Sequence, residues 1–189
     1  MHYWLVIGPR QSGKSNFLAA TALSILKLGG SSWEILAFML RRGNLASMLK
    51  NEPRIAVISN LDLIIQACQN LEKLLTIEEN PNKKYLLLID DLGMAFETGK
   101  SQQLKEALDA LVSKARERTD FYLIASGLIE ELRQGMTTTI IKLLRQSNTG
   151  IGFSIDPIVL EWLGVPSVAI MPYRKLEYPP GRGFFVSRK

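Results

Sequence analysis

Short apolar runs alternate with longer segments of helical periodicity along the whole chain. The runs that are compact enough to predict buried strands lie at residues 3–7, 33–40, 54–58, 85–89 and 121–125. Further strands are expected towards the end of the chain, at residues 150–155, 168–171 and 184–187. The most apolar of these runs, 85–89, leads directly into two aspartates.

Between these runs, apolar residues recur at the three- and four-residue spacing of helices. The predicted helices span residues 13–28, 61–75, 101–118 and, interrupted near Gly135, 130–145. Asn60 is the predicted N-cap of the second helix. Strands that alternate with helices are typical of βαβ units, so the pattern predicts an α/β domain with a mainly parallel sheet and helices on both faces. No repeat, low-complexity tract or linker divides residues 1–189, which predicts a single domain.

A glycine-rich motif follows the first predicted strand and precedes the first helix. It fits G-x-x-x-x-G-K-[ST] at every position and comprises Gly8, Pro9, Arg10, Gln11, Ser12, Gly13, Lys14 and Ser15. Backbone N–H groups of such a loop form a concavity that binds phosphate. We expect Lys14 to reach the β- and γ-phosphates of ATP, Ser15 to ligate Mg²⁺, and Asn16 to complete the contacts.

The aspartate pair after run 85–89 is the second candidate for nucleotide chemistry. In P-loop nucleoside triphosphatases, an acidic residue at the end of a buried strand organises the Mg²⁺ shell, and Asp90 fits this role. The next position often holds a glutamate that polarises the attacking water. Asp91 stands there instead and is one methylene shorter, so hydrolysis is expected to be slow. The alternative is an aspartate pair that begins a turn or caps a helix.

The strand predicted at 121–125 ends in Ser126 and Gly127. In RecA-like sheets this strand end carries a polar residue that faces the γ-phosphate, so Ser126 is a candidate catalytic contact. A simple turn at the end of the strand is the alternative. Together, the three strand ends predict the nucleotide site of a P-loop NTPase.

The amino-acid composition excludes several other kinds of site and protein class. Hydrophobic residues make up 47% and charged residues 22%, which is typical of a globular domain. The lone His2 and lone Cys68 exclude a disulfide framework and histidine-based metal sites, and Cys68 is expected to be a buried small residue in a cytosolic setting. No apolar run reaches the length of a membrane span, and no signal-peptide pattern is present. The net charge of +5 is modest and spread out, which argues against DNA as a partner.

Four segments together carry a resemblance to a known family: HYWLVIGPRQSGKSNFL, LLLIDDLGMAF, KARERTDFYLIASG and the ending TGIGFSID…LGV…YPPGRGFFVSRK. They resemble the FtsK/SpoIIIE class of motor ATPases, and within it the C-terminal ATPase modules of the type VII secretion protein EssC or EccC. The resemblance spans nearly the whole chain, and its tail, with Pro-Gly-Arg-Gly at residues 180–183, is its most specific part. Two departures from the family are Asp91 in place of a glutamate, and the bulky Pro9 and Arg10 inside the loop.

The resemblance implies a RecA-like P-loop NTPase domain that binds ATP and Mg²⁺, hydrolyses ATP weakly or uses it to regulate, and helps to recognise and export small helical proteins. It implies that residues 1–189 are one module of a longer protein at the cytoplasmic face of the cell membrane, anchored through segments absent here. Its expected partners are secreted helical proteins and neighbouring ATPase modules, and a hexameric ring is expected for the full-length protein.

In rings of this class, an arginine of one subunit reaches the γ-phosphate bound by its neighbour. The candidates are Arg116, Arg118 and Arg182, with surface charge or packing at the sheet edge as the alternative. Two other functions stay open. One is a docking module that binds secretion substrates without nucleotide, and the other is a DNA-translocating motor.

Overall fold

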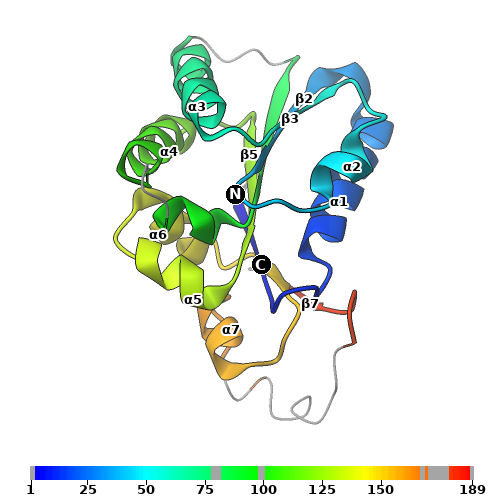
Figure 1. Ribbon diagram of the computed structural model, residues 1–189, viewed down its shortest axis with the longest axis vertical. Helices are drawn as coiled ribbons and strands as arrows, with labels where there is room; N and C mark the ends of the chain where they lie inside the picture. Colours follow the sequence, from blue (N-terminus) through cyan, green and yellow to red (C-terminus); the bar gives the residue numbers. More distant parts are fainter. Residues whose placement is uncertain (1–2, 78–81, 98–100, 167–168, 170–178, 188–189) are drawn as a thin grey trace.

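The computed structural model describes residues 3–77, 82–97, 101–166, 169 and 179–187, which form a layered α/β structure around one sheet (Figure 1). Its strands are β1 (Tyr3–Ile7), β2 (Trp33–Met39), β3 (Ile55–Ile58), β4 (Lys84–Asp90), β5 (Phe121–Gly127), β6 (Gly150–Gly152) and β7 (Phe184–Val186). The strand order within these residues is β3-β2-β4-β5-β1-β6-β7. The strands pair in parallel up to β6, and β7 pairs antiparallel to β6.

Helices cover both faces of the sheet (Figure 1). One face packs against α1 (Lys14–Gly29) and α2 (Leu45–Leu49). The opposite face packs against α3 (Leu61–Thr76), α4 (Ser101–Ala115), α5 (Ile129–Leu132), α6 (Thr139–Gln146) and α7 (Pro157–Trp162). Short 3₁₀ turns are present at η1 (Gly30–Ser32), η2 (Leu92–Phe96) and η3 (Arg133–Gly135). Alternation along β1 divides its side chains between the two layers, with Val6 in one core and Leu5 and Ile7 in the other.

The predicted fold class is confirmed, and most predicted elements are present within a few residues of their expected bounds. The side chain of Asn60 accepts hydrogen bonds from the N–H groups of Asp62 and Leu63, so its predicted capping role is confirmed. The helix predicted at 130–145 is divided into α5, η3 and α6. The strand predicted at 150–155 ends at Gly152. The one predicted at 168–171 lies outside the described residues except for Ala169.

Two short helices were missed because each is too brief to show a period. In α2, only five residues are helical. In α7, the side chain of Asp156 accepts the N–H of Ile158 and Pro157 occupies the first turn, so the helix is specified by its cap and not by apolar spacing. Within the described residues, no helix is both long enough and apolar enough to cross a membrane.

The sheet brings the predicted chemistry to one edge. In a parallel sheet the carboxyl ends of the strands share an edge, and here β1 ends in the glycine-rich loop, β4 in Asp90 and β5 in Gly127. Strand β5 lies between β1 and β4, with Ile7 paired to Gly127 and Ile89 paired to Ala125. The loop, the aspartate pair and Ser126 are therefore neighbours in space.

Candidate nucleotide-binding site

Two glycines of the glycine-rich loop occupy positions that disfavour a side chain, one through its backbone conformation and one through a close contact. Gly13 adopts φ +105° and caps the amino end of α1, in a region that L-residues rarely visit. A Cβ atom built on Gly8 would lie 2.6 Å from Cβ of Phe153. Gln11 also has a positive φ, of 61°. The loop consequently turns tightly from β1 into α1 and directs the start of the helix towards the site.

The Pro-Gly-Arg-Gly turn packs directly on this loop. The N–H of Gly181 donates to the carbonyl of Ser12 at 2.9 Å, and a Cβ atom on Gly13 would lie 3.2 Å from Cα of Gly181. A Cβ atom on Gly183 would lie 2.7 Å from the carbonyl oxygen of Gly152. The tail that carried the family resemblance therefore supports the loop from the β6–β7 side, with glycines where backbones approach closely.

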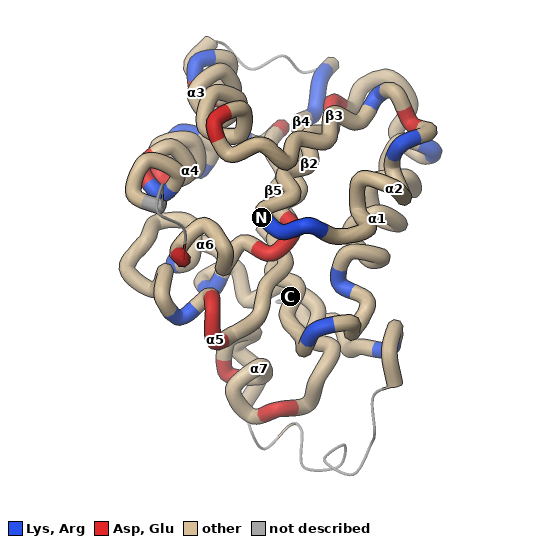
Figure 2. The backbone as a smooth tube through the Cα atoms, in the orientation of Figure 1, with Lys and Arg blue, Asp and Glu red and all other residues tan. Residues whose placement is uncertain are grey.

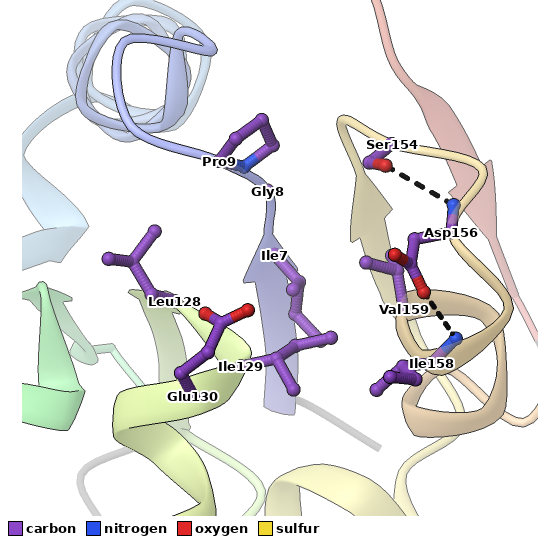
Figure 3. A pocket seen from close by; sticks show the side chains of 10 residues that line it. All are labelled: Ile7, Gly8, Pro9, Leu128, Ile129, Glu130, Ser154, Asp156, Ile158 and Val159. Carbon is purple, nitrogen blue, oxygen red and sulfur yellow. Dashed lines mark hydrogen bonds between the residues drawn. The ribbon is translucent and has the colours of Figure 1, made fainter.

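Most of the predicted loop residues line one open cavity of about 430 Å³. From the loop it takes Arg10, Gln11, Ser12, Gly13, Lys14, Ser15 and Asn16, and from other elements Arg41, Arg42, Gly43, Asn44, Met48 and Asp91. Gly8 and Pro9 face elsewhere. They line a smaller cavity of about 130 Å³, between residues 128–130 and the start of α7 (Figure 3). The larger cavity has a volume common for ligand sites.

Lys14 is buried at the base of the loop, with a relative exposure of 7%. Its Nζ donates to the carbonyl oxygens of Gly8, at 3.0 Å, and Pro9, at 2.8 Å. Burial lowers the pKa of Lys14, while the carboxylates of Asp91 and Asp90 oppose that shift. The ammonium group is thus held inside the loop, beside the cavity that the loop lines.

Asp90 is the centre of a short hydrogen-bond chain. Its Oδ2 accepts from Oγ of Ser15 at 2.8 Å, and its Oδ1 accepts from Oγ of Ser126 at 2.7 Å. Oγ of Ser126 in turn accepts the N–H of Asp91 at 3.0 Å. The fully buried Ser126 donates its hydroxyl hydrogen to Asp90, and in this structure it therefore positions that carboxylate. A contact between Ser126 and a γ-phosphate stays a prediction.

These residues fit Mg²⁺ and a phosphate ligand. The hydroxyl of Ser15 and the carboxylate of Asp90 are hard oxygen donors side by side, and Mg²⁺ commonly takes one or two protein ligands along with phosphate and water. Within the described residues, no group of three or more His, Cys, Asp or Glu side chains could hold a metal alone. Oγ of Ser12, buried in the loop, also has no hydrogen-bond partner among them.

Asp91 has a strained backbone and a shifted carboxyl group. Its φ of 58° and ψ of 52° are left-handed, a conformation that aspartate tolerates better than most residues. Burial, and then the adjacent Asp90, raise the pKa of Asp91, whereas Lys14 and Arg41 act in the opposite direction. A carboxylate with a raised pKa is a better proton acceptor.

Among the residues of the site that the sequence analysis missed, Arg41 and Glu131 are opposite charges in contact with each other. Nη2 of Arg41 lies 2.6 Å from Oε1 of Glu131, and its Nε lies 4.0 Å from Oδ2 of Asp91. Nη2 of Arg10 approaches the same Oε1 at 3.6 Å. Arg41 could have been found, because it follows β2 at the same edge of the sheet. No signal distinguishes Glu131 from Glu130 beside it.

The arginines proposed to act on a neighbouring subunit occupy different surroundings. Nε and Nη2 of Arg118 bond the carboxylate of Asp120, at 2.9 and 2.7 Å, and Nη1 donates to the carbonyls of Leu75 and Ile77. These contacts give Arg118 a structural role at the edge opposite the loop. Arg116 lies at that same edge near Tyr3, and Arg182 is exposed in the turn beside the loop. A role in trans stays a prediction for each.

No protein-family model matches the sequence, and no curated protein matches it significantly. Solved structures do. The cytoplasmic domain of the type VII secretion ATPase EccC of Thermomonospora curvata aligns with a TM-score of 0.74 and 19% identity. The alignment covers 100% of this chain and 22% of the EccC chain. A second EccC structure, of ATPases 2 and 3 in complex with a signal sequence peptide, aligns with a TM-score of 0.69 and 18% identity. This alignment covers 98% of this chain and 34% of the EccC chain.

Two further solved structures are also similar. The pCW3 conjugation coupling protein TcpA, with ATPγS, has a TM-score of 0.69 and 20% identity, covering 98% of this chain and 57% of that one. B204, the DNA-packaging ATPase of Sulfolobus turreted icosahedral virus, has a TM-score of 0.61 and 15% identity, covering 94% and 88%. The chain has a RecA-like P-loop ATPase fold. The predicted likeness to EccC-type ATPase modules is confirmed at the level of this fold. The chain spans about 22% of the length of the EccC cytoplasmic domain.

Proposed function

We propose that this chain is an ATP- and Mg²⁺-binding module of a type VII secretion ATPase. The observation that carries the nucleotide part is the hydrogen bond from Ser15 to Asp90, which joins the phosphate loop to the acidic strand end at 2.8 Å. Bound ATP would supply a phosphoanhydride whose cleavage can drive movement. The amides of the loop and Lys14 would hold its phosphates, and Ser15 and Asp90 would hold Mg²⁺.

Hydrolysis is proposed to be weak, with Asp91 as the group that accepts a proton from water. Its carboxylate is one methylene shorter than the glutamate common at this position. Nε of Arg41, 4.0 Å from Oδ2 of Asp91, stabilises the charged form but does not outweigh burial, which raises the pKa of Asp91. Turnover by the wild type and an Asp91→Glu variant tests this role: faster turnover in the variant supports it, and equal turnover contradicts it.

The secretion role rests on the similarity to EccC, one of whose structures holds a signal sequence peptide. Because this chain covers 22% of the EccC cytoplasmic domain, residues 1–189 are proposed to be one RecA-like module of a longer protein. Its proposed partners are small helical export substrates and the neighbouring ATPase modules, in a hexamer at the cytoplasmic face of the membrane.

Titration of a synthetic C-terminal signal peptide from a small helical export substrate tests this role. We expect saturable binding that changes when Mg-ATP is added. Equal affinity with and without Mg-ATP would favour a docking module in which nucleotide plays no part. A scrambled peptide of equal charge is the matched control, and equal binding of the scrambled peptide would contradict specific recognition.

DNA translocation is the second candidate, because the similarity to the DNA-packaging ATPase B204 covers 94% of this chain and 88% of that one. Figure 2 shows acidic and basic residues interspersed over several helices and loops, with no single basic track among the residues that the structure describes. Phosphate contacts in a motor would give DNA affinity that falls steeply with salt. We expect negligible, salt-independent affinity for duplex DNA, and a steep salt dependence would favour the motor instead.

A further inference from the structure

A buried carboxylate beside the phosphate loop holds two arginines with one of its oxygens. Glu131 is 6% exposed, although it lies on α5, a helix of four residues. Its Oε1 accepts from Nη2 of Arg41 at 2.6 Å and lies 3.6 Å from Nη2 of Arg10, which belongs to the loop. Its Oε2 is buried and has no partner among the described residues. The carboxylate is therefore only partly satisfied, a costly arrangement for a buried charge.

The backbone around Glu131 is tightly packed, so this placement is built into the fold. A Cβ atom on Gly93 would lie 2.4 Å from Cβ of Glu131. Gly93 belongs to η2, the turn that directly follows Asp91. The carboxylate thus links α5 to three parts of the site: the phosphate loop through Arg10, the end of β2 through Arg41, and the turn after β4 through its own packing.

Arg41 is the more accessible member of the pair. Its side chain is 26% exposed, against 8% for Glu131, and it lines the same 430 Å³ cavity as the loop. Its planar fork can bond a phosphate through two parallel N–H donors, and such bonds are among the strongest that arginine makes. A terminal phosphate in that cavity would compete with Glu131 for the same guanidinium group.

We propose that Arg41 distinguishes ATP from ADP: Glu131 holds Arg41 when no nucleotide is bound, and Arg41 transfers to the γ-phosphate when Mg-ATP binds, which releases Glu131 and α5. This inference rests on the proposed nucleotide binding. ADP has no γ-phosphate, so Arg41 stays with Glu131 in the ADP complex. The transfer of Arg41 from Glu131 to the γ-phosphate thus communicates the state of the nucleotide to α5. The start of this helix lines the smaller cavity, which Gly8 also lines (Figure 3).

Calorimetry with Mg-ATPγS and Mg-ADP tests the transfer in the wild type, Arg41→Gln, Glu131→Gln and the double variant. We expect Arg41→Gln to weaken Mg-ATPγS by about tenfold or more, the usual size of a charged hydrogen bond, and Mg-ADP by less than about twofold. We expect Glu131→Gln to tighten Mg-ATPγS several-fold, and this gain to vanish in the double variant, because Glu131 acts through Arg41.

Two outcomes would overturn the proposal. One is an ATPγS-to-ADP affinity ratio that Arg41→Gln leaves unchanged. The other is an equal gain from Glu131→Gln with and without Arg41, which would mean that the carboxylate acts only as a remote charge. Arg41→Lys keeps the positive charge but lacks the planar guanidinium group. If its ATPγS-to-ADP affinity ratio is close to that of Arg41→Gln, the bidentate contact is supported; if its ratio equals that of the wild type, the bidentate contact is contradicted. If the wild type binds neither nucleotide, the proposed function fails along with this inference.

Matched controls are available in the same chain. Glu130→Gln removes an equal charge from the adjacent position, whose side chain lines the smaller cavity in Figure 3. Arg54→Gln breaks an exposed pair with Glu52, in which Nε lies 2.9 Å from Oε1, at the opposite edge of the sheet. Both variants should leave the ATPγS-to-ADP ratio at its wild-type value. A change in the ratio with Glu130→Gln as large as with Glu131→Gln would contradict the specific pair.

Hydrogen exchange supplies a readout that does not depend on affinity. Release of Glu131 removes a tie on α5, so the amides of Ile129–Leu132 should exchange faster in Mg-ATPγS than in Mg-ADP. The difference should disappear in Arg41→Gln. Equal exchange of α5 in the two nucleotides in the wild type would contradict the release.

Discussion

Replacement of Ser126 by alanine removes the hydroxyl on which the acidic strand end depends. Two hydrogen bonds are lost: the one to Oδ1 of Asp90, at 2.7 Å, and the one from the N–H of Asp91, at 3.0 Å. A hydrogen bond to a charged group contributes about 1.5–3 kcal/mol, and a buried N–H left without a partner costs about 1–3 kcal/mol. We expect the free energy of unfolding to fall by about 3 kcal/mol, equivalent to about 6–12 °C in Tm for a domain of this size.

Urea and thermal unfolding, followed by circular dichroism, measure this loss. Ser113→Ala is the matched control, because its hydroxyl donates to the carbonyl of Asp109 at 2.7 Å on an exposed helix face. That variant should stay within about 0.5 kcal/mol of the wild type. The same Ser126→Ala protein should need a higher Mg²⁺ concentration for nucleotide binding, since Asp90 is no longer held. A loss below about 0.5 kcal/mol for Ser126→Ala would refute this account of the strand end.

Three further outcomes follow from the site and the core. Because burial raises the pKa of Asp91, the charged form of this carboxyl group destabilises the fold at pH 7. Asp91→Asn should therefore have a larger free energy of unfolding than the wild type at pH 7. This difference should shrink as the pH falls towards 3.8, as measured by urea titrations of both proteins. Gly13→Ala should lower the free energy of unfolding by at least about 1–2 kcal/mol, because Gly13 has φ +105° and Cα of Gly181 lies 3.2 Å from the position of the added Cβ atom; an unchanged free energy of unfolding would contradict the packed tail. Burial raises the pKa of the Cys68 thiol to about 12, so Cys68 should react with a disulfide reagent only on unfolding, and rapid labelling of the native protein would contradict its burial.

The sequence was most informative where chemistry depends on consecutive residues. The loop from Gly8 to Ser15 and the pair Asp90 and Asp91 could be predicted because each motif is local and follows an apolar run. The burial of Cys68 was likewise predicted from its apolar neighbours and is confirmed.

What could not be predicted depends on pairing between distant strands. The bond between Ser126 and Asp90 requires β5 beside β4, in the register that places Ile89 opposite Ala125. Glu131 could not be chosen over Glu130, because a helix of four residues shows no period that separates an inner from an outer face. The support of the loop by Gly181 also depends on β7 returning antiparallel beside β6.

The central claim is that the glycine-rich loop binds Mg-ATP, and calorimetry of the wild type beside Lys14→Ala tests it most directly. Lys27→Ala, in the exposed last turn of the same helix, controls for the loss of a positive charge. We expect saturable binding by the wild type, no change for Lys27→Ala, and an affinity at least about tenfold weaker for Lys14→Ala, since a charged contact to phosphate is lost. Equal affinities for Lys14→Ala and the wild type would contradict the claim.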